Sequence, residues 1–398
     1  MRILEVSRYK NNFADHQLPF VSEQGESICA LGHEVEYFLV KGNYVTAVRE
    51  LKKKIREFKP DIVHAHYGLS AITAELQGLV PVVTTFHNGE TLNPIVNLMS
   101  SLMSLRAKHV IYVAQHIRDL SYFKAKNYSI IPCGVPMEQM IITPKDEARR
   151  QLGWDLDKKY ILFGGAFDNL RKNYALLREA VEIIEKENKN IKNTVCAAIN
   201  VNKEEIKNDE FQVTCSTSNS IDPQSAQKQA FGQSDAQSYS DTDKSYPLDS
   251  SEKNDSYLES TKNDKNIICI EMKGLSRAEC VMRMCAADLF ALPSHSEGSP
   301  QALTEAMACN CPCIATDIAD VRELFGDEPG HWILRNPRKT HERWDGDEKS
   351  LDEMVELLNE ALKFEGRTKG RKRILELGLS NEQVAKRIVK IYEQILNV

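Results

Sequence analysis

Residues 294–316 read S-H-S-E-G-S-P-Q-A-L-T-E-A-M-A-C-N-C-P-C-I-A-T, and this stretch decides the fold of the region around it. The apolar run A-D-L-F-A-L-P at 287–293 precedes it and predicts a buried strand. Ser299 is placed to cap a following helix, and Pro300 to occupy its first turn, where a missing N–H costs nothing. The pattern therefore predicts a strand, a turn, a helix and a second strand at P-C-I-A-T.

This arrangement also predicts a ligand. A helix N-terminus after a glycine-containing turn can hold phosphate, because its free N–H groups and its dipole attract anions. Gly298 permits close approach of the backbone to a ligand. Glu297 ends the strand segment and Glu305 lies eight positions later inside the helix, where a carboxylate can accept hydrogen bonds from ribose or sugar hydroxyls. We therefore expect a nucleotide-sugar site beyond the carboxyl ends of the strands.

The rest of the chain alternates short apolar runs with amphipathic stretches. Strands are predicted in the first third at R-I-L-E-V, H-E-V-E-Y-F-L-V, D-I-V-H-A-H, V-P-V-V-T-T-F-H, H-V-I-Y-V-A and Y-S-I-I-P. A second series is predicted at Y-I-L-F-G-G-A, T-V-C-A-A-I-N, N-I-I-C-I-E-M, A-D-L-F-A-L-P and P-C-I-A-T. Strands that alternate with helices form parallel βαβ units. We therefore predict an α/β protein with two doubly wound, Rossmann-like domains.

The chain length of 398 residues suits two domains of average size. We predict a first domain at 1–140, a second at 155–378 and a C-terminal helix at 379–398, which opens with a capping box of Ser380 and Gln383. Residues 203–265 are rich in Ser, Asp, Asn, Gln and Lys, and they lack long apolar runs. We interpret them as a disordered insertion in the second domain.

Composition excludes several classes of protein. The net charge of −6 argues against nucleic-acid binding, which needs a strong basic excess. Charge interrupts the first residues within five positions, and no apolar stretch approaches a membrane span, so we expect a cytoplasmic protein. Cys309, Cys311 and Cys313 lack the C-x2-C spacing of zinc sites, and we expect them to pack in a core.

The E-x7-E element and the helix end A-M-A-C-N-C-P resemble the signature of glycosyltransferase family 4, whose retaining enzymes have the GT-B fold. The resemblance covers nearly the whole chain except the insertion. It implies transfer of a sugar from a nucleotide-sugar to a sugar or lipid-linked acceptor, in bacterial surface polysaccharide or glycolipid biosynthesis. It further implies that Glu297 faces the donor sugar, that Glu305 binds the ribose, and that the backbone of Gly298, Ser299 and Pro300 approaches the sugar and diphosphate.

Other residues acquire roles through the same resemblance. Arg171 and Lys172 follow the strand Y-I-L-F-G-G-A-F at the head of a helix, where two cations are unfavourable unless an anion lies between them. Lys172 matches the family's phosphate-contacting lysine. His87 matches a first-domain histidine that contacts the donor sugar and is predicted to be catalytic with Glu297 and Lys172. Three residues of I-E-M-K-G match the segment near the nucleobase: Met272, Lys273 and Gly274.

We expect neither a cofactor nor a metal, because cationic side chains and a helix dipole can neutralise the leaving group. His64 and His66 lie on one face of a strand, but no third ligand is evident from the sequence, which favours a packing or cleft-wall role. Two alternatives to a transferase stay open, a nucleotide-sugar epimerase and a non-catalytic binding subunit. The basic run R-E-L-K-K-K-I-R-E-F-K at 49–59 is either a solvated face or a contact with anionic lipid headgroups.

Overall fold

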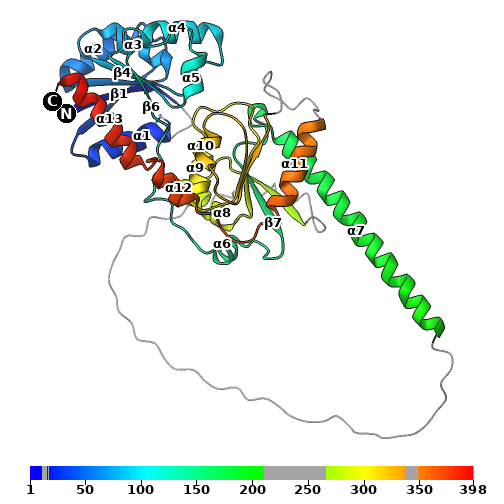
Figure 1. The fold of residues 1–398 in the computed structure, drawn as a ribbon. Helices are drawn as coiled ribbons and strands as arrows, with labels where there is room; N and C mark the ends of the chain where they lie inside the picture. Colours follow the sequence, from blue (N-terminus) through cyan, green and yellow to red (C-terminus); the bar gives the residue numbers. More distant parts are fainter. Residues whose placement is uncertain (11–15, 17, 210–265, 337–347, 398) are drawn as a thin grey trace, which may run out of the picture. The chain divides into compact units, whose positions relative to one another are not determined.

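The computed structural model describes residues 1–10, 16, 18–209, 266–336 and 348–397 (Figure 1). Residues 1–186 and 266–398 form one compact unit that contains two parallel sheets, and residues 187–265 form a second unit. Each sheet has helices on both faces. Two parallel-sheet α/β domains are therefore present, and the predicted fold class is confirmed.

The first sheet has six strands in the order β2-β1-β3-β4-β5-β6. The strands are parallel, as βαβ connections require: β1 (Arg2–Arg8), β2 (Glu34–Val40), β3 (Ile62–His66), β4 (Val82–Phe86), β5 (His109–Tyr112) and β6 (Tyr128–Ile130). Every residue of β3 and β4 is buried, because helices cover both faces of the sheet at its centre.

Five helices belong to this part of the chain: α1 (Pro19–Ala30), α2 (Ala47–Phe58), α3 (Gly68–Gln77), α4 (Pro94–Ser104) and α5 (Gln115–Leu120). One face of the first sheet packs against α1 and the C-terminal helix α13 (Asn381–Leu396), and the other face packs against α2 and α3. The last helix of the chain therefore completes the core of the first domain.

The second sheet has five parallel strands in the order β11-β10-β9-β7-β8. Its strands are β7 (Lys159–Phe163), β8 (Ile267–Glu271), β9 (Leu289–Leu292), β10 (Cys313–Thr316) and β11 (His331–Leu334). Its helices are α6 (Lys145–Leu152), the 3-10 turn η1 (Leu170–Lys172), α7 (Tyr174–Asp209), α8 (Arg277–Ala286), α9 (Gln301–Ala308), α10 (Val321–Phe325), α11 (Glu348–Ala361) and α12 (Gly370–Glu376).

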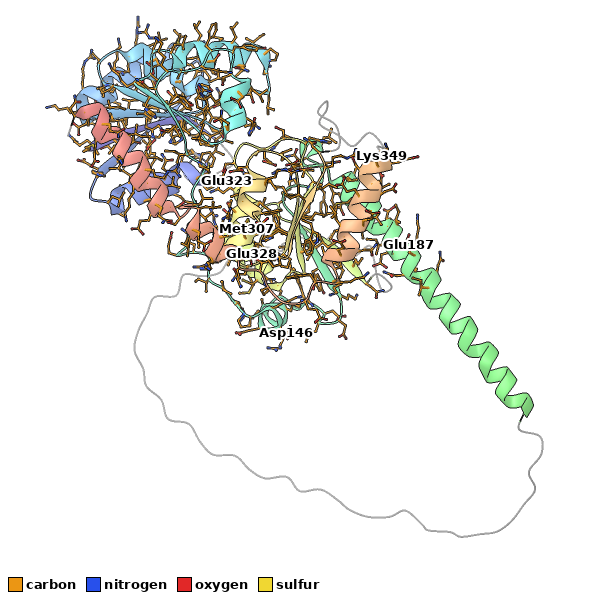
Figure 2. All side chains as sticks on the ribbon, viewed as in Figure 1. Asp146, Glu187, Met307, Glu323, Glu328 and Lys349 are labelled. Carbon is orange, nitrogen blue, oxygen red and sulfur yellow. The ribbon has the colours of Figure 1, made fainter. Side chains whose placement is uncertain are left out.

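The two faces of the second sheet have separate cores. The helices α8, α9, α10 and α12 cover one face, while the first turns of α7 and the helix α11 cover the other (Figure 1). Met307 of α9 is fully buried in the first of these cores (Figure 2). Cys309, Cys311 and Cys313 are fully buried there too, which confirms that they pack as small apolar residues.

Two local predictions are wrong. The run T-V-C-A-A-I-N at 194–200 is not a strand but part of α7, because it is flanked by lysine- and glutamate-rich segments that favour a helix. The helix α7 also includes residues 203–209, which the sequence assigned to the insertion, and residues 210–265 lie outside the described residues. The strand that the sequence missed is β11, at the edge of the sheet beside β10.

The predicted cap of the site helix is also wrong. Pro300 is the N-cap of α9, and no side chain caps this helix. The hydroxyl of Ser299 instead accepts a hydrogen bond from the backbone N–H of Cys133, with 3.3 Å between Oγ and N. Of the capping box predicted for α13, the structure shows the serine half: the Ser380 hydroxyl accepts a hydrogen bond from the backbone N–H of Gln383 and donates to Gln383 Oε1. Among the described residues, no helix has the length and hydropathy of a membrane span.

Candidate active site

Two cations converge on the carboxylate of Glu297. The Lys172 Nζ lies 2.7 Å from Glu297 Oε1, and the Arg171 Nη1 lies 3.3 Å from Oε2. The Glu297 side chain is buried, so these pairs are little screened by solvent. The sequence analysis expected an anion between Arg171 and Lys172, and in this structure the Glu297 carboxylate is that anion.

The turn η1 aims both cations at the end of β9. The Asn169 side chain caps this turn by accepting a hydrogen bond from the backbone N–H of Arg171. The Arg171 guanidinium donates to the backbone carbonyl of Ser296, and its own carbonyl accepts from the His295 N–H. A Cβ on Gly165 would come within 2.8 Å of the Lys172 side chain, so only glycine leaves room for this lysine.

The charge of Glu297 is stabilised in the folded protein. Burial by itself raises the pKa of this carboxyl, but the nearby ammonium of Lys172 and guanidinium of Arg171 outweigh burial, so its pKa is lowered. Glu297 is therefore ionised at neutral pH. A fixed negative charge at this position can face positive charge that develops on a substrate.

Glu297 lies where the two domains meet. A Cβ on Gly298 would come within 2.4 Å of the backbone oxygen of His87, so this close approach requires glycine. The Asn88 amide donates to Ser296 Oγ across the same boundary, at 3.1 Å. A cavity of about 270 Å³ opens here, and its lining includes Phe20, Tyr67, His87, Asn88, Cys133, Arg171, Glu297, Gly298, Ser299 and Gln301.

Glu305 belongs to a second charged group. The guanidinium of Arg277, on α8, bonds to the carboxylates of Glu305 and of Glu23, which lies on α1 of the first domain. Burial raises the pKa of the Glu305 carboxyl to about 7, and Glu23 adds to this rise while Arg277 opposes it. Glu305 is therefore poised to change its charge near neutral pH.

His87 is positioned from two sides. Its backbone N–H donates to the Glu90 carboxylate, which also accepts from the Gly68 N–H at 2.9 Å. Its ring Nε2 lies 3.2 Å from His66 Nδ1, and His66 Nε2 lies 2.8 Å from Glu5 Oε2. Burial, and then the neighbouring His66, lower the pKa of His87 well below its usual range. His87 is therefore a neutral imidazole at neutral pH.

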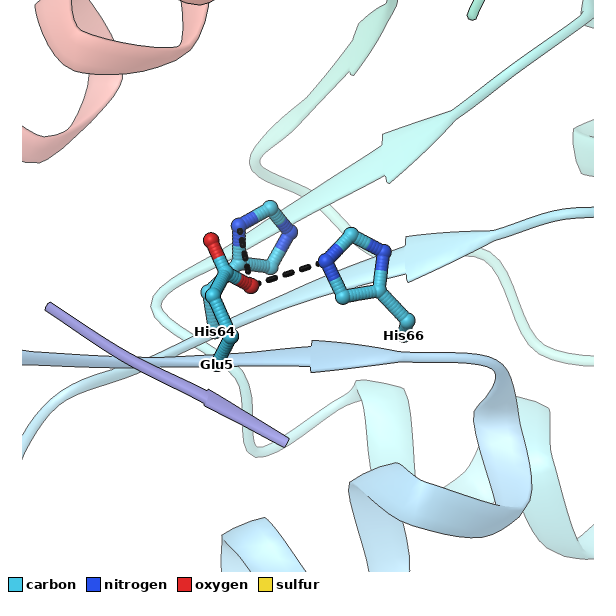
Figure 3. Close-up of side chains that lie close together, drawn as sticks. All are labelled: Glu5, His64 and His66. Carbon is cyan, nitrogen blue, oxygen red and sulfur yellow. Dashed lines mark hydrogen bonds and ion pairs between the residues drawn. The ribbon is translucent and has the colours of Figure 1, made fainter. Parts of the chain in front are cut away.

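No third ligand for His64 and His66 is evident from the sequence, and the structure places Glu5 beside them (Figure 3). Glu5 pairs with His64 in the register of β1 and β3, and all three side chains are fully buried. Their donor atoms lie within 4.8 Å of one another, which is compatible with a metal ion.

Hydrogen bonds already occupy the ring nitrogens of this group. His64 Nδ1 lies 2.5 Å from the Tyr392 hydroxyl, and His64 Nε2 lies 2.7 Å from Thr85 Oγ1. Both nitrogens of His66 are bonded to His87 and Glu5. Because a metal would have to displace these bonds, we interpret the group as a hydrogen-bond chain that leads from buried Glu5 to His87 in the cavity.

The other predicted residues lie at the carboxyl ends of the strands in the second sheet. Met272, Lys273 and Gly274 follow β8, where Gly274 has a positive φ of 71° and Lys273 Nζ lies 3.1 Å from Asp168 Oδ2. They do not line the cavity that contains His87 and Glu297, and neither do Lys172, Glu305 or Pro300. The predicted residues therefore form a cavity group, the Lys172–Glu297 pair that adjoins it, and a group around Arg277 and β8.

Four charged residues of the site were not predicted from the sequence: Glu5, Glu23, Glu90 and Arg277. Glu90 stands in F-H-N-G-E, three residues after the predicted His87, and Arg277 stands in G-L-S-R, three residues after the predicted Gly274. A charged residue next to a predicted site residue could have indicated these two. Nothing local points to Glu5 or Glu23, since Glu5 is a single acid in a strand and Glu23 a helix residue of the other domain.

Comparisons with known proteins identify the family of the chain. The family model for Glycosyltransferase Family 4 matches residues 21–139, and that for Glycosyl transferases group 1 matches residues 251–358. A stretch of 43 residues is 54% identical to a protein of Bacillus subtilis (strain 168) named for teichuronic acid biosynthesis, the glycosyltransferase TuaC. That match spans only 11% of this chain and 11% of the relative.

Solved structures resemble the whole chain. A sucrose-phosphate synthase from Thermosynechococcus elongatus superposes with a TM-score of 0.64 at 15% identity, and the match covers 100% of this chain and 99% of that one. Anabaena Alr3699/HepE in complex with UDP-glucose superposes with a TM-score of 0.56 at 13% identity, covering 100% of this chain and 98% of that one. At these identities the likeness shows the fold.

Proposed function

The chain belongs to the glycosyltransferases of the family 4 type, with the GT-B fold, and we propose that it moves a sugar from a nucleotide-sugar to a hydroxyl acceptor with retention at the anomeric carbon. The observation that carries this proposal is the convergence of Lys172 and Arg171 on the buried Glu297, beside a cavity that His87 lines from the other domain. In such a site the two cations can neutralise a leaving diphosphate, while Glu297 faces the positive charge that develops on the sugar ring.

The donor is proposed to be a nucleotide diphosphate sugar. One structural neighbour holds UDP-glucose, and we take a UDP-sugar as the first candidate. The ribose would bind at Glu305, the base along the backbone of Met272, Lys273 and Gly274, and the diphosphate at the backbone of Ser299 and Pro300 before α9. Burial of Glu305 favours this role, since ribose hydroxyls would satisfy a carboxylate that water reaches poorly.

The chemical step breaks the bond between the anomeric carbon and the diphosphate oxygen. Negative charge grows on the leaving oxygen, and the cations of Lys172 and Arg171 would stabilise it more in the transition state than in the ground state. The acceptor oxygen forms the new bond to the anomeric carbon on the same face, and its proton passes to a leaving phosphate oxygen. No covalent glycosyl-enzyme is needed.

Glu297 and His87 would hold the sugar ring. The ionised Glu297 faces positive charge that develops on the ring, while His87 accepts a hydrogen bond from a sugar hydroxyl through a ring nitrogen. Two cations already neutralise charge at this position, so we propose that no metal or cofactor takes part. Loss of activity on exhaustive chelation, restored by one added metal, would contradict this part of the proposal.

The setting is proposed to be bacterial surface polysaccharide or glycolipid biosynthesis, on the cytoplasmic side of the membrane. The short match to a protein named for teichuronic acid biosynthesis supports this setting. A sugar or lipid-linked sugar acceptor would then bring the enzyme to the membrane surface.

Two measurements test the proposal. A panel of nucleotide-sugars, starting with UDP-glucose, is assayed for donor hydrolysis and for thermal stabilisation. The same panel without acceptor separates a transferase from an epimerase, because only an epimerase converts the donor sugar to its epimer without an acceptor.

Replacing Lys172 tests its assignment to the leaving group. We expect Lys172→Ala to lower kcat by about 10²–10³ with a smaller change in KM, as for loss of one transition-state donor. Lys172→Arg keeps the positive charge and should retain more activity. Lys53→Ala removes an exposed lysine of α2, far from the site in sequence, and serves as the control. An unchanged kcat in Lys172→Ala would show that another group receives the leaving charge.

A further inference from the structure

The helix α4 carries its apolar side chains on the outside. Its buried positions are polar or small: Asn97, Ser100, Ser101 and Ser104. Its exposed positions are large and apolar: Ile95, Leu98, Met99 and Leu102, with Leu105 just beyond its end. Ile95 is 70% exposed. At 100° per residue these exposed positions fall on one side of the helix, so α4 is amphipathic in the direction opposite to a normal surface helix.

The buried face explains why the fold does not need the apolar one. The helix packs against α3, where Gly68 lies so close that a Cβ would come within 2.2 Å of the Ser100 side chain. The hydroxyls of Ser101 and Ser104 donate to backbone carbonyls of α4 itself, at 2.6 and 2.7 Å. Small side chains on this face allow close packing against α3, and the large apolar side chains of α4 stay exposed on the opposite face.

A segment beside α4 also exposes apolar side chains. The Asn97 amide donates to the carbonyl of Leu120, and its oxygen accepts from the Tyr122 N–H, so the end of α5 lies beside α4. Exposed apolar side chains there include Leu120, Tyr122 and Phe123. The exposed apolar side chains of α4 and of this segment exceed the scattered apolar residues that an ordinary surface carries.

The charge around this face is positive. No Asp or Glu occurs in residues 91–118; Glu90, just before them, is buried, and Asp119, just after them, contacts Arg118 at 3.9 Å. Arg106, Lys108, Lys124 and Lys126 are exposed, and Lys108 and Lys126 line one hollow beside the starts of β5 and β6 and the end of α13. An apolar face bordered by cations fits a lipid surface with anionic headgroups. A second copy of the chain fits less well, because its cations would meet these.

We propose that α4 lies flat on an anionic lipid bilayer, with Ile95, Leu98, Met99 and Leu102 among the acyl chains and the neighbouring cations at the headgroups. This surface adds to the proposed function and does not rest on the donor site. It also differs from the basic helix α2, whose apolar side chains Leu51, Ile55 and Phe58 are buried in the core. The α2 cations Lys53 and Lys54 are partly paired with glutamates.

Vesicle sedimentation of the full chain tests the proposal. The vesicles are phosphatidylcholine alone or an equal mixture of phosphatidylcholine and phosphatidylglycerol. We expect binding to the mixed vesicles that weakens with salt, and a decrease in affinity of roughly tenfold or more in Ile95→Gln/Leu102→Gln. Leu156→Gln changes an exposed leucine of the second domain and should bind like the wild type. Lys53→Gln/Arg56→Gln tests α2 in the same way.

A second readout reports insertion directly. The tryptophans are Trp154, Trp332 and Trp344, all outside the first domain, so Leu98→Trp adds a reporter on α4. Its emission should shift to the blue on mixed vesicles and be quenched by brominated lipid. The proposal is overturned if the wild type does not sediment, if Ile95→Gln/Leu102→Gln binds as the wild type does, or if only the α2 variant loses binding. A dimer in light scattering that Ile95→Gln/Leu102→Gln dissociates would assign the face to a second copy instead.

Discussion

At the scale of the residue, hydrogen bonds fix the proton on His87. Glu5 Oε2 lies 2.8 Å from His66 Nε2, and when it accepts from His66 Nε2–H, His66 Nδ1 has a lone pair that accepts from His87 Nε2–H. His87 Nδ1 is then an acceptor, and it faces the Cys133 thiol at 3.8 Å and the cavity. Through the single ring of His66, the buried Glu5 thereby prepares His87 to accept from a sugar hydroxyl.

Replacing His66 tests this chain. We expect His66→Gln to shift the pH profile of kcat and to allow both tautomers of His87, which ¹⁵N chemical shifts of the imidazole distinguish. Glu5→Gln should have the same effect on the shifts, because an amide no longer requires a donor at His66 Nε2. His109, which is bonded to Ser129 at 2.9 Å in the same domain, provides an internal control. A single, unchanged His87 tautomer in both variants would disprove the chain.

Glu305 predicts a pH dependence of donor binding. Its carboxyl has a pKa of about 7 in the folded protein, raised from 4.5 chiefly by burial. Ribose hydroxyls donate more strongly to a carboxylate than to a neutral carboxyl, so we expect donor affinity to rise roughly fivefold between pH 6 and pH 8. Glu305→Gln should remove this dependence. Isothermal titration at both pH values measures it, and equal slopes in variant and wild type would contradict it.

The ionisation of Glu305 should also change the stability of the protein, but in the opposite direction. Stability should fall as pH rises, whereas donor affinity should increase. Because the folded pKa exceeds the unfolded one, burial favours the neutral carboxyl, and ionisation costs stability as pH rises from about 4.5 to about 7. Glu305→Gln should therefore raise Tm more at pH 8 than at pH 5. A larger gain at pH 5 would show that the ion pair with Arg277 outweighs burial.

At the scale of the element, short segments position the site and longer helices support them. The three-residue turn η1 directs Arg171 and Lys172, and its cap is a single asparagine. The helix α9 has no side-chain cap, so the N–H groups of its first turn are free of such a partner. We expect this uncapped end to be available to a phosphate, whereas α13, which has no proposed ligand, begins with an ordinary serine cap.

The cap of α13 gives a stability prediction. Ser380→Ala removes the acceptor for the Gln383 N–H and should lower the free energy of unfolding by about 1 kcal/mol. Ser380→Thr retains a hydroxyl and should lose less. Urea unfolding followed by circular dichroism measures both variants. Equal midpoints for Ser380→Ala and wild type would mean that the cap contributes nothing here.

At the scale of the whole molecule, the C-terminal end of the chain packs against the N-terminal domain. The helix α13 follows the second domain in sequence, yet Ile388, Val389 and Tyr392 pack in the core of the first domain. The Tyr392 hydroxyl also bonds to His64, which stacks on His66 with ring centroids 4.6 Å apart. The last helix therefore supports both the core of the first domain and the hydrogen-bond chain that leads to His87.

A substitution in α13 should affect the first domain. Ile388→Ala leaves a cavity in its core and should lower the free energy of unfolding by about 2–5 kcal/mol. Hydrogen exchange should then increase in β1 and β3, while the strands of the second sheet keep their protection. Lys390→Ala, on the exposed side of the same helix, is the control. Increased exchange confined to the second sheet would contradict this assignment.

The sequence predicted most strands because each parallel strand is a buried apolar run between turn signals. It failed at T-V-C-A-A-I-N, since a short apolar run has the same composition in a buried strand and in a helix, and the structure has a helix there. It also missed β11, whose four residues H-W-I-L lie at an edge of the sheet. Glu297, Lys172 and His87 were predicted because each stands in a local motif at the end of a strand.

The order of residues in the sequence thus determined the two α/β domains and the strand, turn and helix around Glu297. It also determined the site residues that stand in recognisable motifs. Only the tertiary structure could bring Glu5 beneath His66, link Glu23 to Glu305 through Arg277, and leave the apolar face of α4 outside. Each of these depends on side chains from segments far apart in sequence, and a periodic pattern records which residues share a face but not what that face meets. The same limit explains the wrong prediction for Ser299. The local pattern assigned its hydroxyl to a helix cap, whereas in the folded protein this hydroxyl accepts a hydrogen bond from the backbone N–H of Cys133.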